Sequence, residues 1–91
     1  MVTRLNICIP RINKRVTKKD VWSVFEKYRF GSIKSVVIGG ERDSRCVFID
    51  YYSWRTDVPR VKAVYDRLME GKDIKIIYDT QWHWRCVKSR M

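Results

Sequence analysis

At 91 residues, with 45% hydrophobic and 13% aromatic residues, the chain has room for one domain, spanning residues 1–91, and enough apolar side chains to exclude disorder. No apolar run approaches the roughly 20 residues of a membrane-spanning helix, and the N-terminal residues lack the apolar stretch of a signal peptide, so we expect neither a membrane partner nor export. Twenty Lys and Arg against ten Asp and Glu leave a net charge of +10, which favours a polyanionic partner.

The first predicted elements are a strand and a helix. Apolar residues at every second position from Leu5 to Ile9 predict a strand with one buried face, which Pro10 ends. The segment Thr17-Lys18-Lys19-Asp20 has the form of a capping box, in which the threonine bonds a free backbone N–H group and the acid reaches back. A stripe of apolar residues follows at helical spacing, and Gly31 ends the helix. The stripe consists of Val21, Val24, Phe25 and Tyr28.

Two strands follow the first helix. The apolar residues from Ile33 to Ile38 predict the second strand, which Gly39-Gly40 ends before a charged turn. The third strand is predicted from Cys46 to Tyr52, and its side chains alternate between two faces. One face carries Val47, Ile49 and Tyr51, and the other carries Cys46, Phe48 and Asp50.

The second half of the chain predicts one helix and two more strands. Asp57 can cap a helix that has Pro59 in its first turn and ends at Gly71. A small extra strand starting at Ile74 precedes the last strand, Trp82 to Lys88. The order of elements predicts an α+β, ferredoxin-like βαββαβ fold, with a four-stranded antiparallel sheet and two helices on one face. The other face of the sheet is then open.

Positive charge concentrates toward both ends of the chain. If the two ends meet in space, they form one basic surface. Residues 1–19 contain no acid and carry Arg4, Arg11, Lys14, Arg15, Lys18 and Lys19. The segment from residue 80 onward also contains no acid and carries Arg85, Lys88 and Arg90.

Several segments are similar to the RNA-recognition motif, and the whole chain resembles that family. The segment Phe25 to Val36 is similar to the family's helix-to-strand passage, Leu5 to Pro10 falls where its shorter strand motif lies, and Ser44 to Tyr51 falls where its eight-residue motif lies. The segments Leu68 to Lys72 and Tyr78 to Cys86 also resemble small proteins of this type from large cytoplasmic DNA viruses. The resemblance implies an intracellular RNA-binding domain, located in the cytoplasm or nucleus, or in the host cell if the source is viral.

The resemblance also implies how the domain binds. In that family, aromatic rings on the two central strands stack on unpaired bases while flanking cations hold phosphates. Asn6 and Cys46 stand at two of the ring positions and only Phe48 keeps a ring. The loss of two rings counts against ordinary base readout on the sheet and adds weight to backbone contacts or a protein partner. The expected nucleic-acid contacts are Asn6, Arg45, Phe48, Trp82, His83, Arg85 and Lys88.

The orientation of the last strand has two alternatives. Trp82 and Trp84 share one face, and His83 and Arg85 lie on the other. If Trp84 and Cys86 point inward, His83 and Arg85 join Phe48 on the open face; in the reverse orientation the two tryptophans form a stacking platform there. We favour the first alternative because a terminal strand must still bury an apolar face.

Other functions are less well supported by the sequence. The three cysteines are widely spaced and no close ligand pair typical of zinc occurs, so we expect reduced thiols, no metal and no cofactor. The single histidine has no nearby acid, and no serine elbow or glycine-rich phosphate loop is present, so we expect no enzyme. The expected function is binding of single-stranded RNA. The alternative is a protein-interaction domain of the same fold, anchored by Trp22, Trp54 or Trp82.

Overall fold

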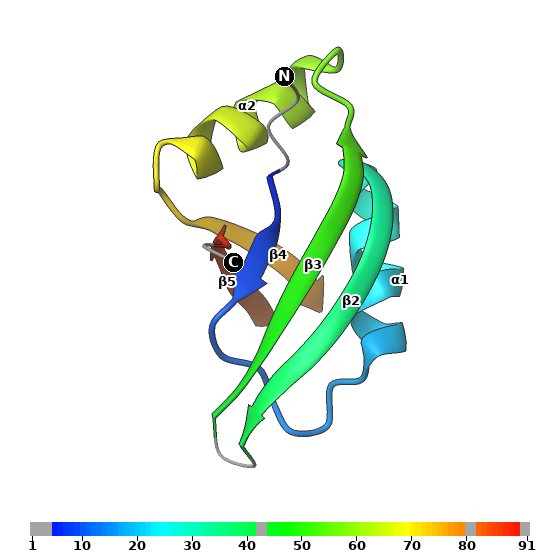
Figure 1. Ribbon diagram of the computed structural model, residues 1–91, viewed down its shortest axis with the longest axis vertical. Helices are drawn as coiled ribbons and strands as arrows, with labels where there is room; N and C mark the ends of the chain where they lie inside the picture. Colours follow the sequence, from blue (N-terminus) through cyan, green and yellow to red (C-terminus); the bar gives the residue numbers. More distant parts are fainter. Residues whose placement is uncertain (1–4, 42–43, 80–81, 90–91) are drawn as a thin grey trace.

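The computed structural model describes residues 5–41, 44–79 and 82–89, which form an α+β fold of two helices and a five-stranded antiparallel sheet (Figure 1). Arg4 and Arg90, two of the cations near the chain ends, lie outside the described residues. Along the chain the elements are β1 (Ile7–Ile9), α1 (Lys18–Tyr28), β2 (Gly31–Glu41), β3 (Ser44–Trp54), α2 (Pro59–Met69), β4 (Ile74–Asp79) and β5 (Trp82–Lys88).

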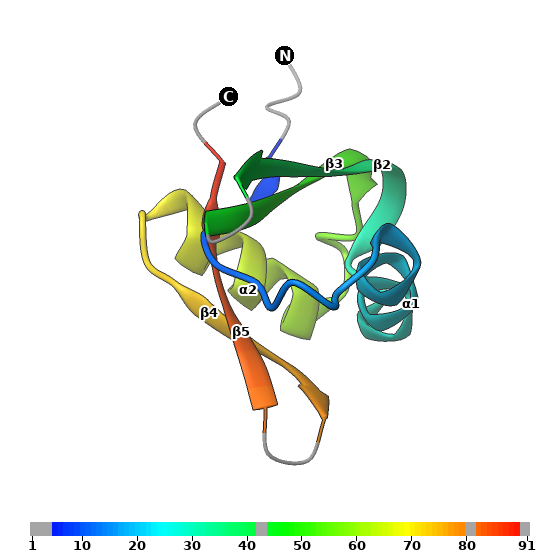
Figure 2. The same cartoon turned by 90° about the horizontal axis from the view of Figure 1, so that it is seen from below.

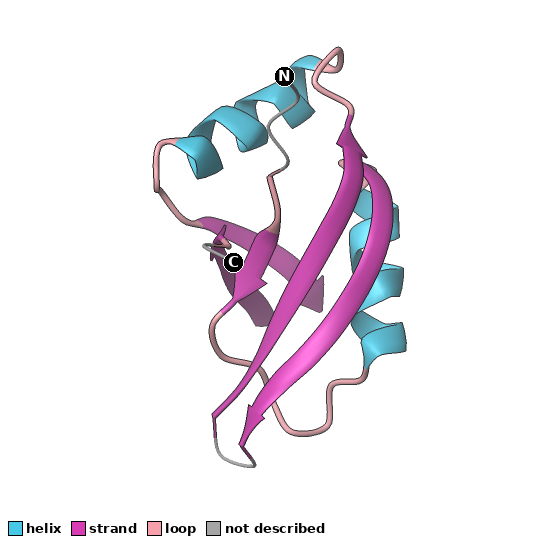
Figure 3. Ribbon diagram, in the orientation of Figure 1, coloured by secondary structure: helices cyan, strands magenta, loops and turns pink. Residues whose placement is uncertain are grey.

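The sheet has the strand order β2-β3-β1-β5-β4, so the expectation of four strands is wrong by one strand at the edge. The segment that was expected to be a small extra strand is a full member, because β4 pairs with β5 from Ile74, opposite Cys86, to Asp79, opposite Trp82. Ile74 and Ile76 are buried while Lys75 and Ile77 are exposed. Pairing with β5 therefore turns the apolar face of β4 toward the core. Figure 3 shows this short hairpin beside the much longer β2–β3 ribbon.

Helix α1 begins at the predicted capping box. The Thr17 hydroxyl accepts a hydrogen bond from the Asp20 N–H at 3.2 Å, and the Asp20 carboxylate accepts one from the Thr17 N–H at 3.0 Å. The helix ends at Arg29, which has left-handed backbone angles, two residues before the expected Gly31. Gly31 instead starts β2, where a Cβ atom would lie 1.9 Å from the Ser53 carbonyl oxygen, so this position requires glycine for close strand approach.

Helix α2 begins differently from the prediction. Its N-cap residue is Val58 and not Asp57, and no side chain caps it. Val58 packs against the core, and Pro59 occupies the first helical turn, where its missing N–H group leaves no bond unmade. The burial of Val58 together with the fixed backbone of Pro59 therefore sets the start of this helix.

The core lies between the sheet and the two helices, which lie on the same side of β1 and β3 (Figure 2). Trp84 and Cys86 point into this core, being 4% and 0% exposed, and this confirms the favoured orientation of the last strand. The buried side chains of the sheet include Ile7, Ile9, Val47, Ile49, Tyr51, Ile76, Trp84 and Cys86, and those of the helices are Val21, Phe25, Val61 and Leu68.

The outer edge of β4 is covered at one point by a side chain of α1. The Tyr28 hydroxyl accepts a hydrogen bond from the Ile77 N–H at 3.0 Å and donates one to the Ile77 carbonyl at 3.1 Å. Both backbone groups of Ile77 are therefore bonded by one phenol. The side chain of Ile77 itself is 62% exposed.

Candidate nucleic-acid interface

The face of the sheet opposite the helices, here called the open face, carries a row of apolar side chains across four strands. The strand register places Val37, Phe48 and Cys8 opposite one another, and Val87 of β5 lies opposite Cys8. Val37 is 47% exposed, and the other three are half-buried. Phe48, the predicted stacking ring, thus lies at the centre of this row.

A second exposed ring follows on the same strand. The β2–β3 register shifts twice, and the two residues left without a partner are Lys34 and Tyr52. Bulges of this kind re-aim side chains. Tyr52 is 58% exposed, and the Lys34 ammonium lies 5.9 Å from the centre of its ring, within cation–π range. Neither residue was among the expected contacts, although the alternation through Phe48 and Asp50, continued by one step, points to Tyr52.

Asn6 has a structural role at the end of β1. Its side-chain oxygen accepts a hydrogen bond from the Tyr51 N–H at 3.1 Å, and its carbonyl accepts one from the Ser89 N–H at 2.8 Å. These bonds extend the pairing of β1 to both neighbouring strands. The Asn6 amide oxygen is therefore already engaged and does not face a ligand as a free acceptor.

Arg45 holds the loop between β1 and α1. Its guanidinium donates hydrogen bonds to the carbonyl oxygens of Lys14 and, at 3.2 Å, of Val16. The Ile12 N–H donates to the Arg45 carbonyl at 3.2 Å. The loop is therefore fixed beside the end of β2 and the start of β3, as Figure 1 shows. The guanidinium of Arg45 is thus occupied by these carbonyl oxygens, and its main effect is to hold the cations of the loop in position.

A hollow of about 890 Å³, here called the basic groove, lies where the loop between β1 and α1 meets the end of β2 and Arg45. None of the described residues that line it is acidic, and two of them are glycines at the end of β2. A methyl group built on Gly39 would lie 4.0 Å from the Phe48 ring, so the groove adjoins the centre of the open face. The described residues that line the groove are Lys14, Arg15, Val16, Thr17, Lys18, Ile38, Gly39, Gly40 and Arg45.

The predicted contacts on β5 lie away from Phe48. The β5 residue next to Cys8 is Val87, whereas His83 and Arg85 are exposed farther along the strand, opposite Ile77 and Lys75 of β4. His83 and Arg85 lie on the same sheet face as Val87, but in the part of β5 that pairs with β4 and not with β1. Lys88 is exposed and pairs with Ile7 at the end of the strand.

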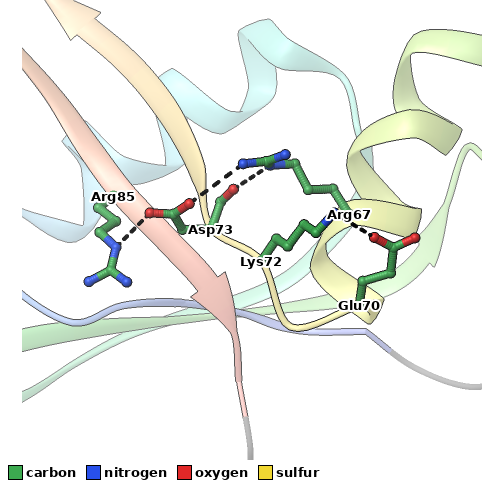
Figure 4. Close-up of polar contacts among 5 residues, drawn as sticks. All are labelled: Arg67, Glu70, Lys72, Asp73 and Arg85. Carbon is green, nitrogen blue, oxygen red and sulfur yellow. Dashed lines mark hydrogen bonds and ion pairs between the residues drawn. The ribbon is translucent and has the colours of Figure 1, made fainter.

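Arg85 is engaged by an acid. Its Nε donates to the Asp73 carboxylate at 2.7 Å, which Arg67 also approaches at 3.7 Å, as Figure 4 shows. The hydrogen bond from Arg85 holds the pKa of Asp73 below its ordinary value. Arg85 is therefore partly neutralised and is a weaker candidate for a phosphate contact than the loop cations.

Three of the four tryptophans are fixed by contacts within the chain. The indole N–H groups of Trp22 and Trp54 donate to the Glu26 carboxylate at 2.9 Å and to the Leu5 carbonyl at 2.7 Å, and Trp84 is buried. Trp82, on the face of Trp84 but near the tip of the hairpin, is 61% exposed.

The cysteines are free thiols. Burial and the neighbouring Cys46 raise the pKa of Cys8, and burial raises that of Cys86, so both are protonated and unreactive near neutral pH. Among residues 5–41, 44–79 and 82–89, no three or more His, Cys, Asp or Glu side chains gather in a way that could hold a metal ion. Neither helix of this part of the chain has the length and apolar character needed to cross a membrane.

Comparison with family models, with curated proteins and with solved structures found no match to this chain. The assignment of function therefore rests on the arrangement of its own residues.

Proposed function

We propose that this chain is a non-catalytic domain that binds single-stranded RNA across its open face and the basic groove. We further propose that its fold is a variant of the RNA-recognition motif. In this interpretation β1, β2, β3 and β5 correspond to the four strands of the ferredoxin-like plan, α1 and α2 to its helices, and β4 to an added edge strand.

The observation that carries the proposal is that the Phe48 ring lies beside Gly39, one of the residues that line the basic groove. A base stacked on an aromatic side chain contributes roughly 1–3 kcal/mol, and this contribution tolerates any sequence because every base has a flat face. The phosphate that follows such a base needs a cation nearby, and Lys14, Arg15 and Lys18 line the adjoining groove. A ring that lies next to a cationic groove matches one nucleotide and its backbone.

The glycines of the groove and the second ring extend the site along the sheet. Gly39 and Gly40 carry no side chain that would keep a nucleotide backbone away from the groove. Tyr52 lies four residues beyond Phe48 on the same strand, roughly 13 Å away at strand spacing, so it would contact a different base. Asp50 lies between them and accepts a hydrogen bond from the Ser35 hydroxyl at 3.3 Å. Its negative charge directs phosphates toward the groove and toward Lys34 at the two ends.

The alternative, a protein-interaction domain, has one specific observation in its favour. Trp82 is a large exposed ring, and tryptophan is enriched at the energetic centres of protein interfaces. Because Trp22, Trp54 and Trp84 are engaged within the chain, Trp82 is the tryptophan that such a partner would contact.

Fluorescence anisotropy with labelled single-stranded RNA, single-stranded DNA and an RNA duplex, each at two salt concentrations, tests the proposal. We expect Phe48→Ala to weaken binding of single strands by about 5- to 150-fold, the equivalent of one stacked base. The matched control is Ile77→Ala, which truncates an exposed apolar side chain on β4 while the Tyr28 bonds to its backbone remain. It should leave affinity unchanged.

Two results would contradict the proposal. An absence of binding at low salt, despite a charge of +10, would favour the protein-interaction alternative. Because Ile77 lies at the far edge of the same sheet face, opposite His83, equal losses in Phe48→Ala and Ile77→Ala would show that Phe48 contributes no more than another exposed apolar side chain of that face. Binding through several phosphates must also weaken steeply as salt rises, which a contact anchored by tryptophan does not.

A further inference from the structure

A second hollow, here called the Trp82 pocket, lies between the β4–β5 hairpin and the first turns of α1. It measures about 520 Å³, which is within the range of sites that take small molecules. Its lining combines three aromatic side chains with polar and charged ones. The described lining residues are Asn13, Arg15, Val16, Asp20, Ser23, Val24, Tyr78, Trp82 and Trp84.

The aromatic side chains of the pocket play two different parts. Trp84 is fixed by stacking on Tyr78, with ring centres 4.3 Å apart, and on Phe25 at 6.3 Å. Trp82 has no aromatic neighbour among the described residues, and its ring is 61% exposed. Trp82 therefore offers a flat apolar surface on which a ligand ring can stack. Trp84 is almost fully buried, so only a small part of its ring forms the wall of the pocket.

Trp84 presents a hydrogen-bond donor. Its Nε1–H group is buried and has no hydrogen-bond partner among the described residues, although the side chain is 4% exposed. A buried donor without a partner costs about 1–3 kcal/mol, and indole nitrogen can only donate. An acceptor atom on a ligand that reaches this N–H group from the pocket would remove that cost.

The remaining lining supplies one acid and one cation. Asp20 caps α1 through one carboxylate oxygen, and the hydrogen bonds from Thr17 lower its pKa, so it is ionised near neutral pH. Arg15 makes no ion pair with any residue that the structure describes. The pocket therefore offers a stacking surface, a buried donor, an anionic acceptor and a positive charge.

Arg15 and Val16 line both the Trp82 pocket and the basic groove. A single strand that leaves Phe48 through the groove would therefore reach this pocket without leaving the protein surface. This continuity, with the positive charge of Arg15, distinguishes a nucleotide from an apolar peptide side chain as the occupant.

We infer that the Trp82 pocket binds one unpaired nucleobase of the RNA strand, stacked on Trp82, with a carbonyl oxygen accepting from Trp84 Nε1–H and its phosphate beside Arg15. The inference rests on the proposed function and extends it to a second base site outside the sheet. Guanine fits the lining best, because it carries the O6 acceptor for Trp84 and amino donors for Asp20.

The test follows the indole N–H signals of the four tryptophans by NMR while guanosine 5′-monophosphate is added, with RNA anisotropy measured on the same protein. We expect the Trp84 signal to move as its N–H gains a partner. The Trp22 and Trp54 signals serve as internal controls, since their N–H groups are already bonded. Trp82→Leu, at an exposed position where the fold does not depend on the ring, should weaken nucleotide binding at least fivefold.

The outcomes separate the two proposals. A Trp84 signal that stays fixed while the protein is saturated with RNA overturns the pocket and leaves the proposed function intact. A signal that moves with the nucleotide in a protein that binds no RNA supports the pocket and overturns the proposed function. A signal that moves with N-acetyltryptophanamide and not with the nucleotide overturns the inference in favour of a protein side chain.

Discussion

The two ends of the molecule carry positive charge in opposite ways. Around α2 and the turn that follows it, acids compensate the cations: Glu70 and Asp73 pair with Lys72, Arg67 and Arg85 (Figure 4). In the loop between β1 and α1 and the first turn of α1, the cations make no ion pair with any residue that the structure describes. These cations are Arg11, Lys14, Arg15, Lys18 and Lys19.

Under the proposed function, this difference points to the RNA-binding end better than the net charge does. Exposed ion pairs such as those around Asp73 contribute between nothing and about 1 kcal/mol, and they neutralise the field around them. In the loop and the first turn of α1, Asp20 is the one acid beside five cations, so like charges predominate there. Such a cluster repels itself, and a polyanion relieves that repulsion. Arg45 holds the loop in place through two backbone carbonyls in spite of this repulsion. The charged end is therefore ordered before any partner arrives.

The largest effect should come from removing charge at one end and not at the other. We expect Arg15→Gln/Lys18→Gln to weaken binding of single-stranded RNA about tenfold or more at low salt. The salt dependence of log K should also fall by about 1.4, at about 0.7 per phosphate contact. Anisotropy titrations over a range of salt concentrations measure both quantities.

The matched control removes two charges from the compensated end. Lys62→Gln/Lys72→Gln loses the same net charge from two exposed side chains that pair with Asp66 and Glu70. Its affinity and salt dependence should stay close to those of the native chain. Equal losses in the two double variants would mean that only total charge matters, and the comparison between the ends would be wrong.

A smaller effect, on stability, should follow from releasing the loop. We expect Arg45→Ala to lower the free energy of unfolding by about 2 kcal/mol, because charged hydrogen bonds to two carbonyls are lost. Arg45→Lys should restore little, since one ammonium cannot bridge two carbonyls as a guanidinium does. Urea unfolding measures the change.

The control for this variant is Arg55→Ala, which removes one exposed charge and should change stability by less than about 0.5 kcal/mol. A loss of similar size in both variants would mean that the Arg45 bonds do not hold the loop.

The smallest effect concerns the compensated end and its response to acid. Because Arg85 lowers the pKa of Asp73, the stabilisation from this carboxylate is present above its ordinary pKa of about 3.9. It disappears as pH falls through the lowered value in the folded protein. NMR titration of the Asp73 carboxyl should therefore give a midpoint below the ordinary value, and Arg85→Gln should move it upward. The control Lys27→Gln removes a charge from α1 and should leave the midpoint of the Asp73 titration unchanged. If Arg85→Gln also leaves this midpoint unchanged, the contact between Arg85 and Asp73 does not form in solution.

The α+β class and the order of all seven elements could be predicted from the sequence, because each element has its own pattern of apolar residues. The expected end of the second strand at Gly39-Gly40 was wrong, since both glycines pair with β3 and β2 continues to Glu41. The capping box at Thr17 is local, and it was confirmed. The start of α2 was not predictable from Asp57, since the burial of Val58 depends on what packs against it. The status of β4 as a full strand depends on its register with β5, which the pattern of β4 alone does not contain.

The candidate site was predictable where a side chain acts from its own strand, and not where it depends on distant backbone. Phe48 follows from strand alternation. Asn6 and Arg45 bond backbone groups of Tyr51 and of the loop before α1, and these partners lie far away in sequence. Lys34 and Tyr52 are brought together by bulges that exist only in the pairing of β2 with β3. The Trp82 pocket likewise requires the hairpin to lie beside α1.

The Tyr28 hydroxyl bonds on the outer edge of β4 bear on whether another copy of the chain can add a strand to this sheet. An edge strand with free N–H and C=O groups is a template to which another chain can add a strand. The Tyr28 phenol of α1 bonds both the N–H and the C=O of Ile77, and this interrupts the template in the middle of β4. The side chain of Ile77 is exposed, so without these bonds the position would favour pairing with another strand. Under the proposed function, these bonds also keep the open face available to RNA, because edge-to-edge pairing of sheets would bring many +10 chains together and hide the surfaces they present.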